Sequence, residues 1–134
     1  MQARLVAIDN GTVVRVYPVE AAGTVYGRAG GDLVQIEDPE VSKQHFRVHL
    51  RRDEWHILDL GSKNGTFVNG EKVGSGILQH GDSVKLGGTS LYFITGHEAD
   101  MPVTGQAIDI SRKAYQQTME HRSVPAPAPG VKAI

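Results

Sequence analysis

The chain has 134 residues and a formal net charge of −1, which suits one domain with a tail and provides no bulk attraction to nucleic acid or anionic membranes. It contains no cysteine, so disulfides, thiolate metal sites and cysteine nucleophiles are excluded. No stretch approaches the roughly 18 apolar residues of a membrane helix, and the apolar run near the start is too short for a signal peptide. We therefore expect a cytoplasmic protein that does not insert into membranes.

Short apolar or alternating segments, separated by turn signals, occupy the chain up to about residue 97. They predict strands at 4–8, 12–19, 24–28, 33–36, 45–50, 55–60, 66–68, 83–87 and 90–95. The alternation is clearest where Phe46, Val48 and Leu50 share one face and polar residues occupy the other. Closely spaced strands with sixteen glycines and no long helical period predict an all-β sandwich.

The composition changes after His97, so we predict a folded domain at 1–97 and an appendage at 98–134. Residues 107–122 have apolar side chains at helical spacing and could form one helix. Residues 123–130, SVPAPAPG, alternate proline with small residues and predict a stiff, extended linker. The C-terminal tail is therefore expected to be flexible or partly helical.

Three of the predicted turns carry hydrogen-bond donors. Arg28 lies in YGRAGGD, Ser42 and Lys43 lie in VSKQH, and Lys63 and Asn64 lie in GSKNGT. If the turns meet at one end of the sandwich, they present a guanidinium, a hydroxyl, amines and a carboxamide, with no carboxylate among them. Such a set suits a dianionic oxygen cluster such as a phosphate.

Taken together, these motifs resemble those of the forkhead-associated (FHA) domain family. The segments GR, SKQH, DLGSKNGTFVNG and LQHGDSVKLG stand in the family's order and spacing, and the resemblance runs from about Leu5 to Ile94. It implies an eleven-stranded β-sandwich that binds phosphothreonine peptides through loops at one end. The expected function is therefore phosphothreonine-dependent protein binding in Ser/Thr kinase signalling, with no catalytic residue, cofactor or metal.

The resemblance also implies roles for individual residues. Arg28 would be the main phosphate ligand, and Ser42 would donate its hydroxyl to the same phosphate. Lys43 stands where the family often has arginine, so it offers a charge and a backbone N–H but no bidentate fork. Lys63 would touch the phosphate as well, whereas Asn64 would hydrogen-bond the peptide main chain.

A second group of residues is expected to shape the site rather than bind the phosphate. Four of them match family positions in the loops: Gly27, His45, Gly65 and Asn69. The segment before Ser42, EDPEV, is acidic through Glu37, Asp38 and Glu40. The resemblance implies that this segment helps to select the residue three places after the phosphothreonine, so we expect it to repel an acidic residue there, with Glu40 as the main discriminator.

Three other interpretations remain open from the sequence. Ser42 and His45 suggest a hydrolase, but no G-x-S-x-G elbow or P-loop ending is present. The sandwich could also be a phosphate-independent scaffold or oligomerisation domain. Finally, the partner could be the chain's own tail, with Thr104 or Thr118 phosphorylated. In each case we expect no nucleic-acid partner.

Overall fold

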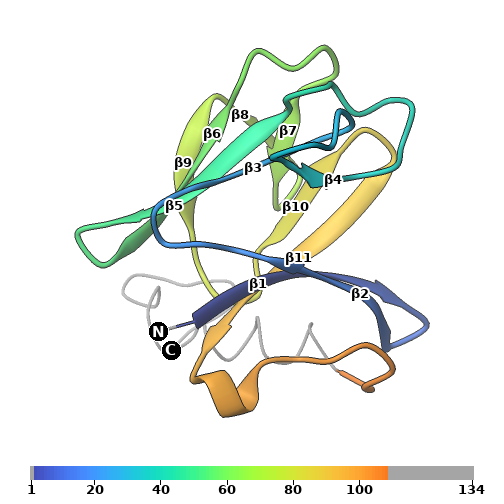
Figure 1. The fold of residues 1–134 in the computed structure, drawn as a ribbon, viewed down its shortest axis with the longest axis vertical. Helices are drawn as coiled ribbons and strands as arrows, with labels where there is room; N and C mark the ends of the chain where they lie inside the picture. Colours follow the sequence, from blue (N-terminus) through green and yellow to red (C-terminus); the bar gives the residue numbers. More distant parts are fainter. Residues whose placement is uncertain (1, 109–134) are drawn as a thin grey trace.

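The computed structural model describes residues 2–108, which form a β-sandwich of two sheets (Figure 1). The six-stranded sheet runs in the order β2 (Thr12–Pro18), β1 (Gln2–Asp9), β11 (Thr89–Gly96), β10 (Ser83–Leu86), β7 (Thr66–Val68) and β8 (Glu71–Val73). The five-stranded sheet runs in the order β4 (Val34–Gln35), β3 (Thr24–Gly27), β5 (Phe46–Arg51), β6 (Glu54–Asp59) and β9 (Ser75–Leu78). The predicted eleven-stranded sandwich is confirmed.

The core lies between the two sheets and is built mainly from aliphatic side chains. In β5, Phe46 and Val48 are fully buried, as their alternation predicts. Trp55 on β6 meets Phe93 on β11 edge to face, with ring centroids 5.9 Å apart, so an aromatic pair joins the two sheets. Because both layers contribute to this core, the loops at the sandwich ends start from fixed positions.

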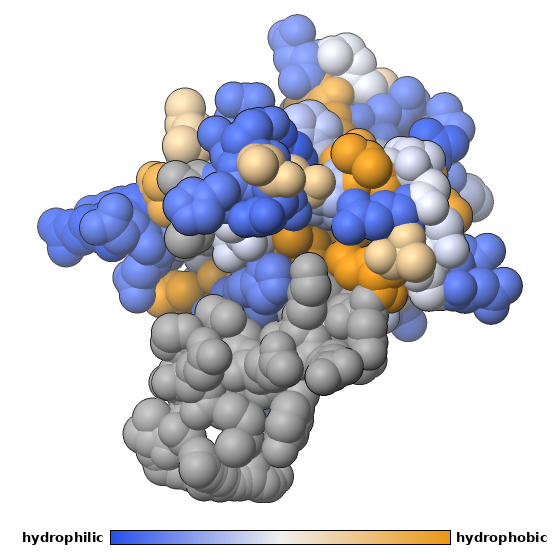
Figure 2. All heavy atoms as spheres, turned by 90° about the horizontal axis from the view of Figure 1, so that it is seen from below, coloured by the Kyte–Doolittle hydropathy of each residue, from blue (hydrophilic) through white to orange (hydrophobic). Residues whose placement is uncertain are grey.

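The outer face of β1, β2 and β11 has its own apolar cluster, and the chain after β11 covers part of it. Val6, Val13 and Ile94 are buried there, and Met101 and Ile108 pack against them. Figure 2 views this end of the molecule and shows apolar side chains reaching the surface between hydrophilic ones. The packing therefore continues beyond the predicted domain boundary at residue 97.

Backbone hydrogen bonds hold the same segment to β2. After the 3-10 turn η1 (Glu98–Asp100), Gly105 donates to the Val13 carbonyl at 2.7 Å and Val13 donates to the Gln106 carbonyl at 2.8 Å. Ala107, the first residue of the predicted helix, forms an isolated bridge with Thr12 instead. The rest of that helix and the predicted linker lie outside the described residues. Within residues 2–108, no helix is long and apolar enough to span a membrane.

Candidate functional site

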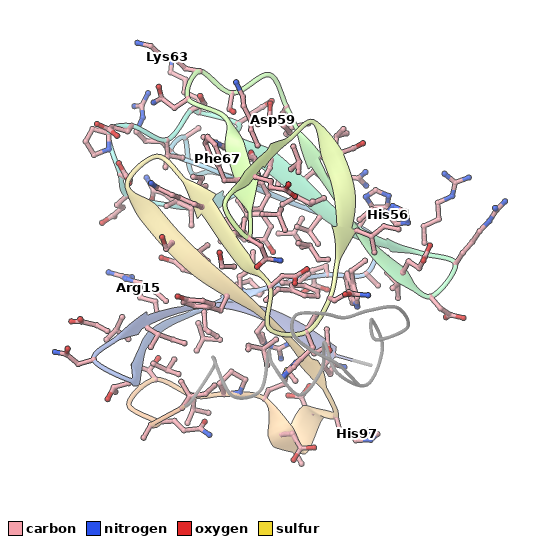
Figure 3. All side chains as sticks on the ribbon, turned by 180° about the vertical axis from the view of Figure 1, so that it is seen from behind. Arg15, His56, Asp59, Lys63, Phe67 and His97 are labelled. Atoms are coloured by element: carbon pink, nitrogen blue, oxygen red, sulfur yellow. The ribbon has the colours of Figure 1, made fainter. Side chains whose placement is uncertain are left out.

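The three donor-bearing turns meet at one end of the sandwich. Tyr26 on β3 pairs with Phe46 on β5, and Phe46 pairs with Asp59 on β6, so the end of β3, the start of β5 and the end of β6 are adjacent. The turns that follow or precede these strands lie together at the upper end of Figure 1, and Figure 3 shows Lys63 there, above Asp59. A pocket of about 510 Å³ opens between the turns and is lined by Arg28, Pro39, Glu40, Val41, Ser42, Lys43, Lys63 and Asn64.

Arg28 reaches the pocket with its guanidinium held in place from behind. Its backbone N–H donates to the Ser42 carbonyl and its Nε–H to the Val41 carbonyl, both at 3.0 Å. The terminal N–H groups of Arg28 have no acceptor among residues 2–108, so a fork of donors faces the pocket. Gly27 allows the end of β3 to lie close to the turn that carries Ser42 and Lys43, because a Cβ on Gly27 would collide with the Lys43 carbonyl oxygen.

Ser42 joins two of the turns and keeps a donor to spare. Its Oγ accepts the Lys63 backbone N–H at 2.9 Å, which leaves the hydroxyl hydrogen able to donate into the pocket. Lys43 has an exposed side chain, and its backbone N–H has no acceptor within the described part of the chain. Asn64 donates from Nδ2 to the Glu40 carbonyl at 2.9 Å, so its side-chain amide links two of the loops that line the pocket.

His45 is fully buried beneath these turns, and its imidazole forms hydrogen bonds with two of them, the Ser42 turn and the Gly65 turn. Its Nδ1 accepts the Ser42 backbone N–H at 3.0 Å, which requires the other ring nitrogen to carry the proton. The Nε2–H then donates to the Gly65 carbonyl at 2.8 Å. Because the imidazole does not bond the Ser42 hydroxyl, the two residues do not form the nucleophile–base pair of a hydrolase.

Asp59 organises the 60–66 turn, although the sequence interpretation did not single it out. Its Oδ2 accepts the backbone N–H groups of Gly61 and Ser62, each at 3.0 Å, while Oδ1 accepts the hydroxyls of Ser62 at 2.5 Å and Thr66 at 2.7 Å. Burial raises the pKa of Asp59, but these hydrogen bonds outweigh burial and hold it below the usual value. The pattern D-L-G-S could have predicted this role, because an aspartate side chain often accepts the backbone N–H groups of the residues that follow it in a turn.

Asp38 has a similar role in the turn that precedes Ser42. Its carboxylate accepts the backbone N–H of Glu40 at 2.9 Å, that of Gly88 at 2.9 Å and the Thr89 hydroxyl at 2.7 Å. The bond from Glu40 is the main cause that lowers the pKa of Asp38. The side chain therefore points to the β10–β11 turn, which differs from the expectation that Asp38 forms part of an acidic rim.

Asn69 lies away from the pocket, in the turn between β7 and β8. Asn69 and Gly70 have φ values of 51° and 87°, the left-handed geometry of a two-residue hairpin turn. The Asn69 carboxamide accepts the Ser83 backbone N–H and donates to the Asp82 carboxylate, both at 3.0 Å. These bonds join the turn to β10 rather than to a ligand.

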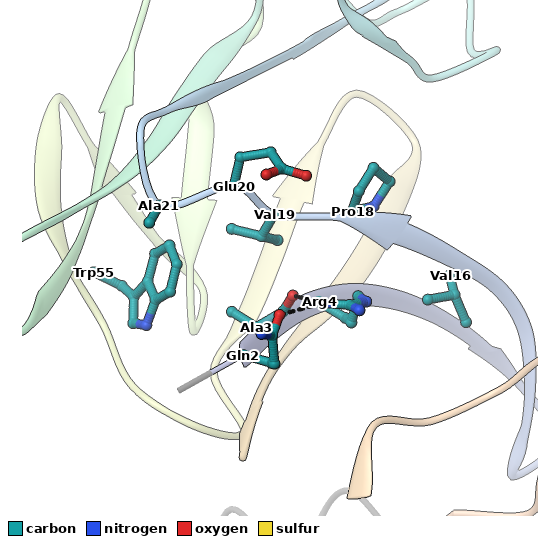
Figure 4. A pocket seen from close by; sticks show the side chains of 9 residues that line it. All are labelled: Gln2, Ala3, Arg4, Val16, Pro18, Val19, Glu20, Ala21 and Trp55. Atoms are coloured by element: carbon teal, nitrogen blue, oxygen red, sulfur yellow. Dashed lines mark hydrogen bonds between the residues drawn. The ribbon is translucent and has the colours of Figure 1, made fainter. Parts of the chain in front are cut away.

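A second hollow, of about 460 Å³, lies beside β1 and β2 and is lined in part by Arg4, Glu20 and Trp55 (Figure 4). Arg4 donates to the Ala3 carbonyl at 2.7 Å and lies 3.6 Å from a Glu98 carboxylate oxygen. Its charge is therefore engaged by the protein, unlike that of Arg28. Among residues 2–108, no group of three His, Cys, Asp or Glu side chains could hold a metal ion.

The fold and the loop motifs define one class of domain. The family model described as "FHA domain" matches residues 24–87, and solved FHA domains superpose on the sandwich. One, from a study of phosphothreonine-dependent FHA domain interactions, has a TM-score of 0.64 at 26% identity and covers 72% of this chain and 99% of that chain. The FhaA FHA domain, complexed with the intracellular domain of Rv3910, has a TM-score of 0.61 at 27% identity over 69% of this chain and 99% of that chain. The chain carries an FHA domain.

Curated relatives extend this similarity to bacterial regulators. The glycogen accumulation regulator GarA of Mycobacterium tuberculosis is 38% identical over 78 residues, which are 58% of this chain and 48% of that protein. The oxoglutarate dehydrogenase inhibitor of Corynebacterium efficiens is 36% identical over 76 residues, 57% of this chain and 54% of that protein. The chain thus spans about half the length of the curated relatives it matches. Their names describe a regulator and an inhibitor.

Proposed function

We propose that this protein binds phosphothreonine-containing proteins in Ser/Thr kinase signalling. The observation that carries the proposal is the donor set at the pocket: the terminal N–H groups of Arg28, the Ser42 hydroxyl hydrogen and the Lys43 backbone N–H have no acceptor among residues 2–108. Donors held by fixed turns and lacking an internal acceptor suit a bound dianion. The similarity to FHA domains studied for phosphothreonine-dependent interactions supports the same ligand.

In this proposal each pocket residue has a distinct role. Arg28 pairs its terminal N–H groups with two phosphate oxygens, and its Nε bond to the Val41 carbonyl keeps the fork oriented. Ser42 donates its hydroxyl, while Lys43 and Lys63, which also line the pocket, add positive charge. Asn64 holds the peptide main chain beside the phosphothreonine and so fixes its register.

The partner in this proposal is another protein, and no catalytic activity is assigned. The second point is supported by the bonding of His45, which accepts from the Ser42 backbone N–H rather than from its hydroxyl, and by the names of the relatives. Thr104 does not suit binding to its own pocket, because its neighbour Gly105 is bonded to Val13 at the end of the sandwich opposite the loops (Figure 1). We place the protein in the cytoplasm, where kinases meet their protein substrates.

The test compares a phosphothreonine peptide with its unphosphorylated twin by isothermal titration calorimetry. We expect a Kd on the order of micromolar, about 8 kcal/mol, for the phosphorylated peptide alone. Arg28→Ala should weaken binding by about 2 to 5 kcal/mol, because the phosphate loses its main charged partner. Arg15→Ala, which removes an exposed arginine on β2, is the matched control and should bind as the wild type does.

Two outcomes would count against the proposal. Full affinity in a folded Arg28→Ala protein would show that the phosphate binds elsewhere. Equal binding of both peptides by the wild type would indicate a phosphate-independent interaction domain instead.

A further inference from the structure

A row of three side chains lies on the outer face of the six-stranded sheet, close to the pocket. Phe67 on β7 pairs with Lys72 on β8 and with Lys85 on β10, so the three side chains share one face. Thr66 is fully buried and Val68 packs against the core, which leaves the intervening Phe67 facing outward. Both lysines are exposed, and we call Lys72, Phe67 and Lys85 the lysine row.

The lysine row begins next to the residues that line the pocket. Gly65 directly follows Asn64, and a Cβ on Gly65 would lie 2.9 Å from Lys72 Cε and 3.4 Å from a Phe67 ring carbon. The Lys72 stem therefore passes over Gly65. In Figure 3, Lys63 lies on the loop above Phe67, at the same end of the sandwich. A peptide that leaves the pocket across Gly65 meets the lysine row next.

The charge of the lysine row is not balanced by neighbouring carboxylates. Neither lysine forms an ion pair with any residue in the described range 2–108. The ion pair found in that range joins Arg4 and Glu98 instead. Glu71 pairs with Val68, so strand alternation turns it to the other face. Asp38, near the start of β11, already accepts three hydrogen bonds. The row therefore offers two ammonium groups beside an aromatic surface.

We propose that the lysine row binds acidic residues on one flank of the phosphopeptide, with an apolar residue of that flank resting on Phe67. This inference rests on the proposed function and names the class of peptide that the site prefers. An extended peptide advances about 3.3 Å per residue, and neighbouring strands lie about 4.8 Å apart. Lys72 and Lys85 flank Phe67 and are therefore about three peptide residues apart, and we expect residues about three to six positions from the phosphothreonine to reach them.

The experiment uses the full chain and three phosphothreonine peptides measured by fluorescence anisotropy. One peptide has neutral flanks, one carries three glutamates at positions three to five before the phosphothreonine, and one carries three at positions four to six after it, so that the third position, which is expected to face Glu40, stays neutral. The protein is the wild type, Lys72→Ala/Lys85→Ala, or Arg15→Ala/Arg51→Ala. The last variant removes the same amount of charge from exposed positions on β2 and β5 and serves as the matched control.

One of the two acidic peptides should bind the wild type about three- to tenfold more tightly than the neutral peptide, as expected for two exposed charge pairs. Lys72→Ala/Lys85→Ala should abolish that gain and leave the neutral peptide's affinity unchanged, whereas the control variant keeps the gain. The gain should also shrink as salt rises. No gain on either flank, or a gain that survives the lysine substitutions, overturns the inference. Failure of the neutral phosphopeptide to bind overturns the proposed function separately.

Discussion

The 60–66 turn depends on one carboxylate, so we expect Asp59→Asn to weaken both the fold and the site. In the wild type the carboxylate accepts hydrogen bonds from Gly61, from the Ser62 backbone and hydroxyl, and from Thr66. An asparagine keeps one acceptor oxygen but places an NH₂ group where the other set of donors points. Hydrogen bonds to a charged group contribute about 1.5 to 3 kcal/mol each, against about 1 kcal/mol for neutral ones. Since Asp59 is half-buried, we expect a net loss of about 1 to 3 kcal/mol in the free energy of unfolding.

The assay is urea unfolding of the wild type and Asp59→Asn at several pH values, followed by phosphopeptide titration. The folded-state pKa of Asp59 is lowered, so its contribution is present above the unfolded pKa of about 4 and is lost as pH falls through the folded-state pKa. The stability difference between the two proteins should therefore be largest near neutral pH and shrink in acid. Because the same turn carries Lys63 and Asn64, peptide affinity should fall in the variant as well.

Thr66→Val provides a graded control, since it removes one of the hydrogen bonds to the carboxylate and leaves its charge. It should cost less than Asp59→Asn. If Asp59→Asn unfolds at the wild-type urea concentration and binds the phosphopeptide with wild-type affinity, the carboxylate does not hold the turn and the reasoning is wrong.

Three further predictions concern the buried histidine, the C-terminal segment and the ligand. His45→Ala should lower the free energy of unfolding by about 3 to 5 kcal/mol, because it leaves the Ser42 N–H and the Gly65 carbonyl unpaired and opens a cavity. Urea titration measures this loss, and a loss below about 1 kcal/mol would contradict the prediction. Met101→Ala should destabilise by about 1 to 3 kcal/mol without changing phosphopeptide affinity, and an unchanged melting curve would show that the segment does not stabilise the sandwich. Peptide affinity should fall as pH drops through about 6, where the phosphate becomes a monoanion, whereas calorimetry showing a flat profile from pH 7.5 to 5.5 would argue against a bound dianion.

The sequence predicted the strands whose apolar and polar residues alternate clearly, and it predicted the turns that carry several hydrogen-bond donors. Phe46 and Val48 are buried as expected, and the turns that carry Arg28, Ser42 and Asn64 meet at one pocket. Their meeting depends on strand pairing between distant segments, which spacing alone does not contain. The family resemblance supplied that information, because it implied that the binding loops lie at one end of the sandwich.

Other features could not be predicted because local patterns do not encode them. The strands β8 and β9 are three and four residues long and are separated by Gly74, so neither shows a usable alternation. Alternation along residues 12–19 places Val14 with Val16 on a common face, yet Val14 is 45% exposed and Val13 is buried. The β1–β2 register shifts between Ala7 and Ile8, and this irregularity changes which residues face inward.

The structure also sharpens the prediction for peptide selectivity, because it leaves Glu40 as the one carboxylate in the pocket lining. Asp38 is engaged by the β10–β11 turn, and Glu37 lines a different hollow together with Arg15. The Glu40 carbonyl accepts from Asn64, so the residue is fixed at the rim while its side chain stays exposed. At about 4 to 6 Å, an aspartate on the peptide would be disfavoured by about 1 kcal/mol at low salt, and by less as salt rises.

We therefore expect a peptide with aspartate three places after the phosphothreonine to bind less tightly than its alanine or lysine counterpart. Glu40→Arg should invert this preference and keep the phosphate requirement, because the Arg28 fork is untouched. Glu37→Arg makes the same change of charge outside the pocket and should leave the preference as in the wild type. Anisotropy titrations of the three peptides at low and moderate salt measure the effect. Preference of the wild type for aspartate would mean that Glu40 does not face this position of the peptide, since a carboxylate at 4 to 6 Å (about 1 kcal/mol of repulsion) could only oppose it.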